Sequence, residues 1–96
     1  MEIKYEHNKT KDEAYKAIDG FLGKLVIQYQ DKIQNYSKNW NPFNDIMDFS
    51  LDAMGREMSG KIQLYDNLVV LEGNVPLLAR PFLKSKIKKE LEKILS

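Results

Sequence analysis

The 96-residue chain has no cysteine and a single histidine, His7. Disulfide and thiolate chemistry are therefore excluded, and a zinc site would need carboxylates, which show no ligand spacing here. His7 follows a predicted strand, where a surface or edge position is more common than the role of a catalytic base. The longest apolar runs, such as residues 68–71, are far shorter than the roughly 20 residues of a membrane-spanning helix. We therefore expect neither a metal site nor a transmembrane segment.

Motifs for catalysis and nucleotide binding are also missing. Asp48 and Asp52 share one face of a predicted strand and so lie about 13 Å apart at ~3.3 Å per residue, too far for the paired carboxylates of a glycosidase. Ser50 has no histidine partner in its sequence context. The isolated glycines at positions 55, 60 and 73 lack the spacing of a phosphate-binding loop. We therefore expect no catalytic residues, no cofactor and no enzymatic activity.

The amino-terminal sequence MEIKYEHNK has neither an apolar segment nor the arginine- and serine-rich character of a transit peptide. We therefore expect the protein in the cytoplasm. Its composition, with 43% hydrophobic residues and a mean hydropathy of -0.51, is that of a soluble globular chain. Because the length is that of one ordinary domain, we expect residues 1–96 to form a single α+β domain.

Basic residues are concentrated near the carboxyl end, although the formal net charge is only +1. Residues 80–93 hold six basic and two acidic side chains, whereas the rest of the chain has nine basic and twelve acidic ones. The tail is therefore basic and the body slightly acidic.

Hydrophobic periodicity predicts a strand and a helix at the start of the chain. Residues 2–7 alternate between apolar and charged side chains, as in a strand with one buried face. Thr10 and Glu13 have the spacing of a capping box, and the apolar residues that follow keep helical spacing. Gly20 and Gly23 predict a bend in this helix, since glycine weakens a helix interior.

The second half reads as strands followed by a helix. The predicted strands cover residues 34–40, which would be short, and residues 46–53, 58–65 and 68–75. Both faces of the last strand are apolar, as expected if it is central in the sheet or covered by a second element. The final helix begins near Pro81, because proline is best tolerated in the first helical turn. The predicted fold is α+β, an antiparallel sheet of four to five strands packed by two helices.

The final helix offers a candidate surface. Its apolar stripe consists of Leu83, Ile87, Leu91, Ile94 and Leu95. Lys86, Lys89 and Lys93 fall on the opposite side, where they either solvate a packed helix or bind an anionic surface. Nucleic acid is the less favoured anion, since the isoelectric point is only about 7.9, no RNA-stacking motif occurs and the strand face is acidic.

Aromatic and apolar side chains outside the stripe also need an interpretation. Phe82, with Leu77 and Leu78 just upstream, either closes the end of the core, which we favour, or forms an exposed apolar patch. Trp40 and Phe43 flank Pro42 in a predicted turn, where they are half-buried covers or, if exposed, anchors for a partner.

The segment SGKIQLYDNLVVLEGNVPLLARPFLKSKIKKELEKIL, residues 59–95, resembles the small bacterial family named for the polyhydroxyalkanoic acid system, whose members are described as granule-region proteins. The residues that carry the resemblance are Gly60, Ile62, Pro76, Phe82, Ile87 and Leu91. The order of elements agrees over nearly the whole chain, although residues 35–48 make the middle longer than the family pattern. The resemblance implies a role in storage-polyester metabolism and supplies no catalytic residue. The fold also looks like a reduced version of the helix-grip lipid-binding domains.

Three hypotheses follow. The first is a non-enzymatic protein that associates with polyhydroxyalkanoate granules or their coat proteins through a surface of Arg80, Phe82, Lys86, Lys89 and Lys93. The second is an acyl-binding pocket between sheet and helix, lined by Phe21, Leu25, Phe49, Ile62, Leu83 and Ile87. The third is a homodimer formed through an exposed strand edge at residues 34–40.

Overall fold

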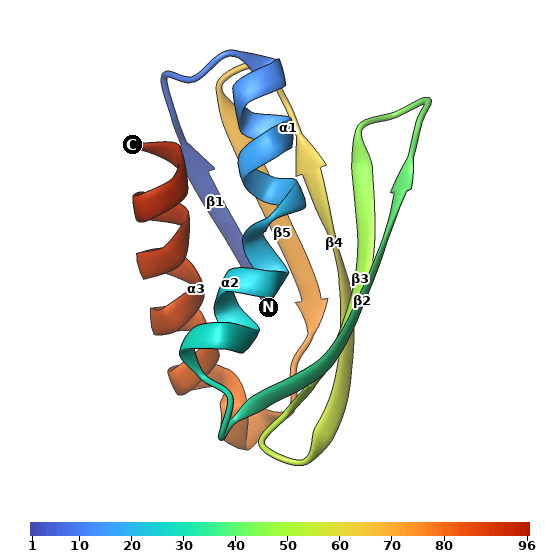
Figure 1. Ribbon diagram of the computed structural model, residues 1–96, viewed down its shortest axis with the longest axis vertical. Coiled ribbons are helices and arrows are strands. Elements are labelled where there is room, and N and C mark those ends of the chain that lie inside the picture. Colours follow the sequence, from blue (N-terminus) through green and yellow to red (C-terminus); the bar gives the residue numbers. More distant parts are fainter.

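The computed structural model describes all 96 residues and confirms the predicted α+β fold (Figure 1). The elements are β1 (Glu2–Glu6), α1 (Lys11–Asp19), α2 (Phe21–Gln28), β2 (Ile33–Asn41), β3 (Ile46–Ala53), β4 (Arg56–Leu64), β5 (Leu68–Asn74), the 3₁₀ turn η1 (Leu77–Ala79) and α3 (Arg80–Leu95). Five strands are present, and the segment 34–40 belongs to one of them, β2.

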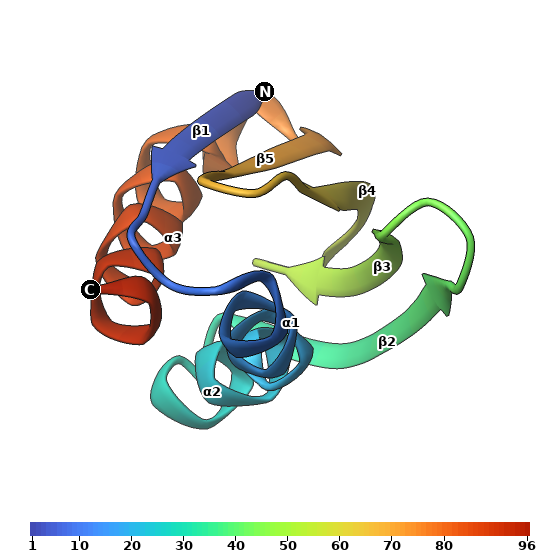
Figure 2. The ribbon, with the colours of Figure 1, turned by 90° about the horizontal axis from the view of Figure 1, so that it is seen from above.

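The strands form one sheet in the order β1-β5-β4-β3-β2, and every neighbouring pair is antiparallel. β2 to β5 follow one another across the sheet, and β1 completes it beside β5, so β1 and β2 are the two edges. The helices all lie on one side of the curved sheet (Figure 2). The opposite side, which we call the open face, is therefore built by strand side chains alone.

The first predicted helix is divided in two at Gly20. Thr10 and Glu13 form the predicted capping box, in which Thr10 Oγ1 accepts the Glu13 N–H at 3.1 Å and Glu13 Oε1 accepts the Thr10 N–H at 2.9 Å. α1 ends at Asp19 and α2 begins at Phe21, so Gly20 separates the two helices, which confirms the predicted bend. A Cβ on Gly23 would lie 3.3 Å from the Tyr36 hydroxyl, so glycine here lets β2 approach α2 closely.

One hydrophobic core joins the sheet to the helices. It contains 22 buried apolar residues, drawn from alternate positions of the strands and from one stripe of each helix. On β5, Val69 and Leu71 are fully buried, whereas Leu68 and Val70 are half-buried on the open face. The apolar character of both faces therefore reflects the interior position of β5 in the sheet, and no second element covers it.

Gly60 on β4 has no room for a side chain. Its partner across the strands is Phe49, and a Cβ on Gly60 would lie only 2.9 Å from Cζ of that ring. The phenyl ring thus packs over the glycine on the inner side of the sheet. A Cβ at position 60 would clash even more closely with the Glu72 carbonyl oxygen of β5, so any larger residue would disturb the β4–β5 pairing as well as the ring.

The edge strand β2 is fastened to the end of α1 by a group of side chains. Lys38 Nζ and Trp40 Nε1 each donate a hydrogen bond of 2.9 Å to Asp19 Oδ1, and we call these three residues the Asp19 clasp. The Trp40 ring also stacks on Tyr15, with centroids 4.3 Å apart. Trp40 is therefore a half-buried cover of the core, the more common of its two interpretations.

His7 is buried, with only 6% of its surface exposed, so the surface position is wrong, whereas the edge position agrees with its place directly after the edge strand β1. Its Nδ1 accepts the Lys9 N–H at 3.1 Å, and its own backbone N–H donates to the Asn67 carbonyl oxygen at 2.9 Å. The first bond lies within the connection between β1 and α1, and the second holds that connection against the β4–β5 turn.

Candidate functional site

The turn before α3 directs two leucines to the solvent. Leu77 and Leu78 are 73% and 83% exposed, whereas Ala79 is buried, and we call the two leucines the leucine turn. Arg80 fixes this turn, because its Nε donates to the Val75 carbonyl oxygen at 3.2 Å. The favoured expectation that the leucines close the end of the core is therefore wrong.

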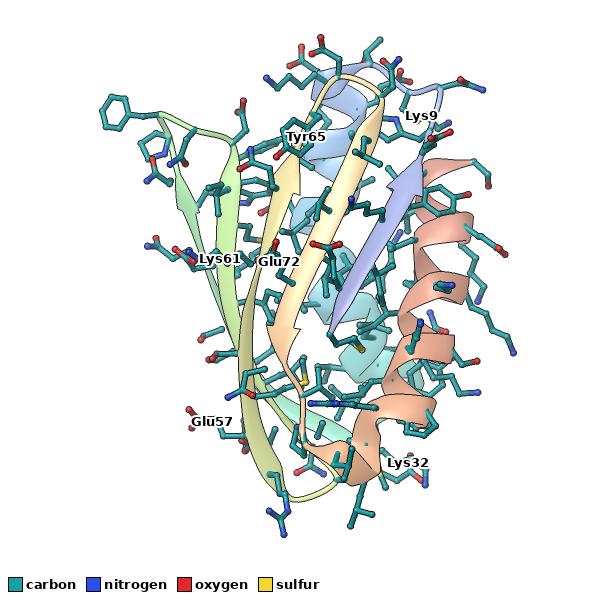
Figure 3. All side chains as sticks on the ribbon, turned by 180° about the vertical axis from the view of Figure 1, so that it is seen from behind. Lys9, Lys32, Glu57, Lys61, Tyr65 and Glu72 are labelled. Carbon is teal, nitrogen blue, oxygen red and sulfur yellow. The ribbon has the colours of Figure 1, made fainter.

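Phe82 follows the leucine turn and forms a cluster with a tyrosine and two lysines. Its ring meets Tyr29 edge to face, with centroids 5.8 Å apart and an interplanar angle of 84°. Lys86 Nζ lies 5.4 Å from the Tyr29 centroid and 5.8 Å from that of Phe82, and Lys32 Nζ lies 5.4 Å from Phe82. Both ammonium groups are within range of cation–π attraction. The aromatic pair thus holds two positive charges near the start of α3, where Figure 3 labels Lys32.

Phe82, Lys86, Lys89 and Lys93 follow one another at three- and four-residue spacing along one side of α3, and we call them the lysine flank. The structure has three ion pairs: Lys4 with Glu2, Lys11 with Asp45, and Lys38 with Asp19. None of them involves a lysine of the flank. The charges of the flank are therefore available to an external anion.

Arg80 is separated from the other residues of the predicted surface. At about 100° per residue it lies about 160° from Phe82 around α3, and its side chain bonds to Val75. Lys32 and Tyr29 take its place beside Phe82. Because they come from the connection between α2 and β2, no helical periodicity could have linked them to the flank.

Glu90 is the one acidic side chain buried in the structure, with 3% exposure. Gln28 Nε2, at the end of α2, donates to Glu90 Oε1 at 2.6 Å. This bond joins α2 to α3 beside the aromatic pair and so holds the flank in place. The sequence itself indicates that Glu90 is buried, since this residue lies three residues after Ile87 and four before Ile94, inside the apolar stripe.

The open face of the sheet has the opposite charge. Its acidic side chains, which alternate with buried ones, are Glu2, Glu6, Asp48, Asp52, Glu57 and Glu72. Its basic side chains are Lys4 and Lys61, and Figure 3 shows Lys61 and Glu72 on this face. The basic helix and the acidic open face therefore give the molecule two sides of unlike charge.

The six residues predicted to line an acyl pocket all belong to the packed core. The structure has five hollows, and Phe21, Leu25, Ile62, Leu83 and Ile87 line none of them. Phe49 borders a shallow hollow at β2 and β3. These side chains therefore stabilise the fold, and the interior gives an acyl chain no space.

The segment 34–40 lies on the edge strand β2, where the predicted dimer contact would form. Pairing of β2 with β3 is interrupted between Gln34 and Ser37, and Asn35 has a φ of 53°. Lys38 points inward to Asp19. The free edge is thus irregular, and dimerisation through it stays a prediction.

None of the helices of the chain is both long and apolar enough to span a membrane.

Comparison with known proteins links the chain to one family. No curated protein and no solved structure matches the chain, so the likeness to helix-grip domains stays a prediction. The family described as "putative polyhydroxyalkanoic acid system protein" matches residues 1–96, the whole chain. The chain therefore belongs to the polyhydroxyalkanoic acid system family, the one it resembles from its sequence.

Proposed function

We propose that this protein is a non-enzymatic, cytoplasmic component of polyhydroxyalkanoate storage that attaches to the surface of the granule. Membership of the polyhydroxyalkanoic acid system family supports the link to storage. The observation that carries the attachment is the position of the exposed leucine turn at the start of a helix whose lysine flank has no acidic partners.

The two parts of this surface would act together. The leucine turn would enter the apolar layer at the granule surface. Full burial of its two leucine side chains contributes about 3–6 kcal/mol, at about 1.5–3 kcal/mol each. Each lysine held near an anionic layer adds about 1 kcal/mol. Interfacial helices combine apolar insertion and electrostatic attraction in this way. Phe82, half-buried against Tyr29, would support the turn from behind.

Co-sedimentation with isolated granules tests the proposal. We expect the wild-type protein to pellet with granules and the double variant Lys86→Glu/Lys89→Glu to bind at least about tenfold more weakly, because two attractive charges become repulsive. The matched control is Lys84→Glu/Lys88→Glu, which makes the same charge change on the side of α3 away from the lysine flank. This control should retain most of the binding.

Two results would contradict attachment through this surface. One is equal binding by the wild type and Lys86→Glu/Lys89→Glu, and the other is equal loss in the two double variants. Binding to native granules that disappears on granules stripped of protein would instead assign the surface to a coat protein. The leucine turn is tested separately with Leu77→Ser/Leu78→Ser, which should bind granules more weakly than the wild type at the same salt concentration.

A further inference from the structure

Met54 has a backbone conformation that methionine rarely adopts. It is the first residue of the two-residue turn between β3 and β4, and its φ is 54°. Gly55 follows with a φ of 81°. Two positive φ values in succession are typical of a type I′ turn, whose first position favours asparagine, aspartate or glycine. The other non-glycine residues with a positive φ are Asn35 and Asp45, so Met54 is the exception.

The side chain of Met54 has no packing role that explains this conformation. It is 48% exposed, and it belongs neither to the hydrophobic core nor to the partly buried side chains that pack against the core. Asparagine at this position would form the turn with less strain. A residue that strains the backbone without stabilising the fold is a candidate for a function.

Met54 and the leucine turn lie at the same end of the molecule, which we call the η1 end (Figure 1). The Met54 N–H donates to the Lys32 carbonyl oxygen at 2.7 Å, and Lys32 Nζ lies 5.4 Å from the ring centroid of Phe82. The β3–β4 turn is therefore joined to the start of α3 through Lys32. Three exposed apolar side chains, Met54, Leu77 and Leu78, thus share the η1 end.

Basic side chains outnumber acidic ones around this end. The basic residues are Lys32, Arg56, Arg80 and Lys86, and the acidic ones are Asp31 and Glu57. None of the six forms an ion pair. Glu57 is part of the open face, where it lies opposite Asp52 on β3. The η1 end therefore combines exposed apolar side chains with a positive charge.

The shape of the η1 end favours a lipid layer over a protein as its partner. Met54, Leu77 and Leu78 line none of the five hollows of the structure. The end therefore offers no pocket for a partner's side chain, whereas the anchor residues of protein interfaces pack in such pockets. Fluid acyl chains need no matching shape, and anionic headgroups above them attract the basic side chains.

We propose that Met54 is a second apolar anchor and that the η1 end contacts an anionic lipid layer, with Met54 and the leucine turn among the acyl chains. The inference rests on the granule attachment proposed above and names the layer that the protein enters. α3 runs roughly along the long axis of the molecule (Figure 1), so at about 1.5 Å per residue Lys93 is about 10 Å farther from this layer than Lys86. Lys32 and Lys86 are therefore the lysines nearest to the headgroups.

Sedimentation of the full chain with lipid vesicles tests the anchor. The wild type should bind vesicles of phosphatidylglycerol and phosphatidylcholine in equal parts at least about tenfold more strongly than neutral vesicles of phosphatidylcholine alone. Met54→Asn should weaken binding to the mixed vesicles about three- to tenfold, since about half of the Met54 side chain is exposed and can be buried there. Met54→Leu should bind like the wild type.

Thermal unfolding separates a lost contact from a damaged fold. Met54→Asn should be at least as stable as the wild type, because asparagine favours the first position of a type I′ turn. Weaker vesicle binding by an equally or more stable variant can then be assigned to the missing thioether side chain.

Matched variants at the opposite end of the molecule locate the contact. Phe43, at the tip of the β2–β3 hairpin, is 95% exposed and so is not a half-buried cover. Its hairpin tip lies at the end opposite to the η1 end (Figure 1), so Phe43→Ser should bind the mixed vesicles like the wild type. Lys32→Glu should weaken binding, whereas Lys9→Glu, at the other end in Figure 3, should not.

Several results would overturn the proposal. They are a wild type that does not bind the mixed vesicles, equal binding by Met54→Asn and the wild type, and an equal loss in Phe43→Ser. A wild type that pellets with granules but not with vesicles would overturn the lipid contact alone and leave granule attachment through a coat protein. A wild type that binds vesicles but not granules would overturn granule attachment and support the lipid contact.

Discussion

At the scale of single residues, Glu90 places one carboxyl group inside an otherwise apolar stripe. Its only partner is the Gln28 side chain, which is itself exposed. A buried polar group that loses its partner costs about 1–3 kcal/mol, whereas an apolar residue of similar shape in its place is often neutral or stabilising. The two ends of this hydrogen bond therefore differ in what their removal does.

We predict that Gln28→Ala lowers the free energy of unfolding by about 1–3 kcal/mol, because it leaves the Glu90 carboxyl without a partner. Glu90→Met should be neutral or stabilising. Urea denaturation of both variants and of the double variant measures the effects. The control lies within the cycle, since Gln28→Ala should have almost no effect once Glu90 is replaced. An equal effect of Gln28→Ala in both backgrounds would show that the hydrogen bond contributes nothing.

At the scale of elements, the Asp19 clasp joins α1 to the edge strand β2. The hydrogen bond donated by Lys38, followed by the one donated by Trp40, holds the pKa of Asp19 below its ordinary value of 3.8. A carboxyl whose pKa is lower in the folded state stabilises the protein above its unfolded pKa, and the stabilisation is lost as the pH falls through the folded value. The clasp should therefore weaken only in acid.

We predict that Asp19→Asn destabilises the protein near neutral pH by no more than about 1 kcal/mol, since exposed ion pairs contribute about 0.2–1 kcal/mol. The difference from the wild type should shrink as the pH falls from 3.8 through the lower pKa of folded Asp19, below which the wild-type carboxyl is itself neutral. Urea unfolding at neutral pH and in acid provides the measurement. Glu13, whose pKa is lowered by its bonds to Thr10, titrates in both proteins and cancels in the comparison. A pH-independent difference would mean that the charge of Asp19 is not involved.

At the scale of the whole molecule, the basic helix and the acidic open face place charges of opposite sign on two sides of the protein. This asymmetry would turn the lysine flank toward an anionic surface. Attraction of the lysine flank to an anionic layer acts over about 10 Å at 0.1 M salt and about 3 Å at 1 M. Apolar insertion of the leucine turn is not screened in this way. Attachment to granules should therefore have one part that salt removes and one that salt leaves.

We predict that granule binding by the wild type falls as salt is raised but does not vanish, because the leucine turn remains inserted. Leu77→Ser/Leu78→Ser should detach at a lower salt concentration than the wild type. Co-sedimentation at increasing ionic strength, with Lys84→Glu/Lys88→Glu as the charge control, gives both curves. Binding that is insensitive to salt in the wild type would rule out a part for the lysines.

The sequence predicts most of the fold, because each element carries a local signal. Alternation marks the strands, Thr10 and Glu13 mark the start of α1, and Pro81 marks that of α3. The candidate surface is predicted less well, since it combines separate segments. Lys32 reaches the flank only through the packing of Tyr29 on Phe82, and the outward position of the leucine turn depends on how the chain enters α3. Such contacts have no periodicity to reveal them.

The irregular edge of β2 has a consequence for the proposed attachment to granules. Crowding on a granule would bring many copies within reach of one another, and a long, straight, unpaired strand would then template fibrous cross-β assembly. The interruption at Asn35 breaks the regular ladder of backbone groups on that edge, and Lys38 places an inward-pointing charged residue on the same strand. The strand edge thus resists amyloid growth even at high local density.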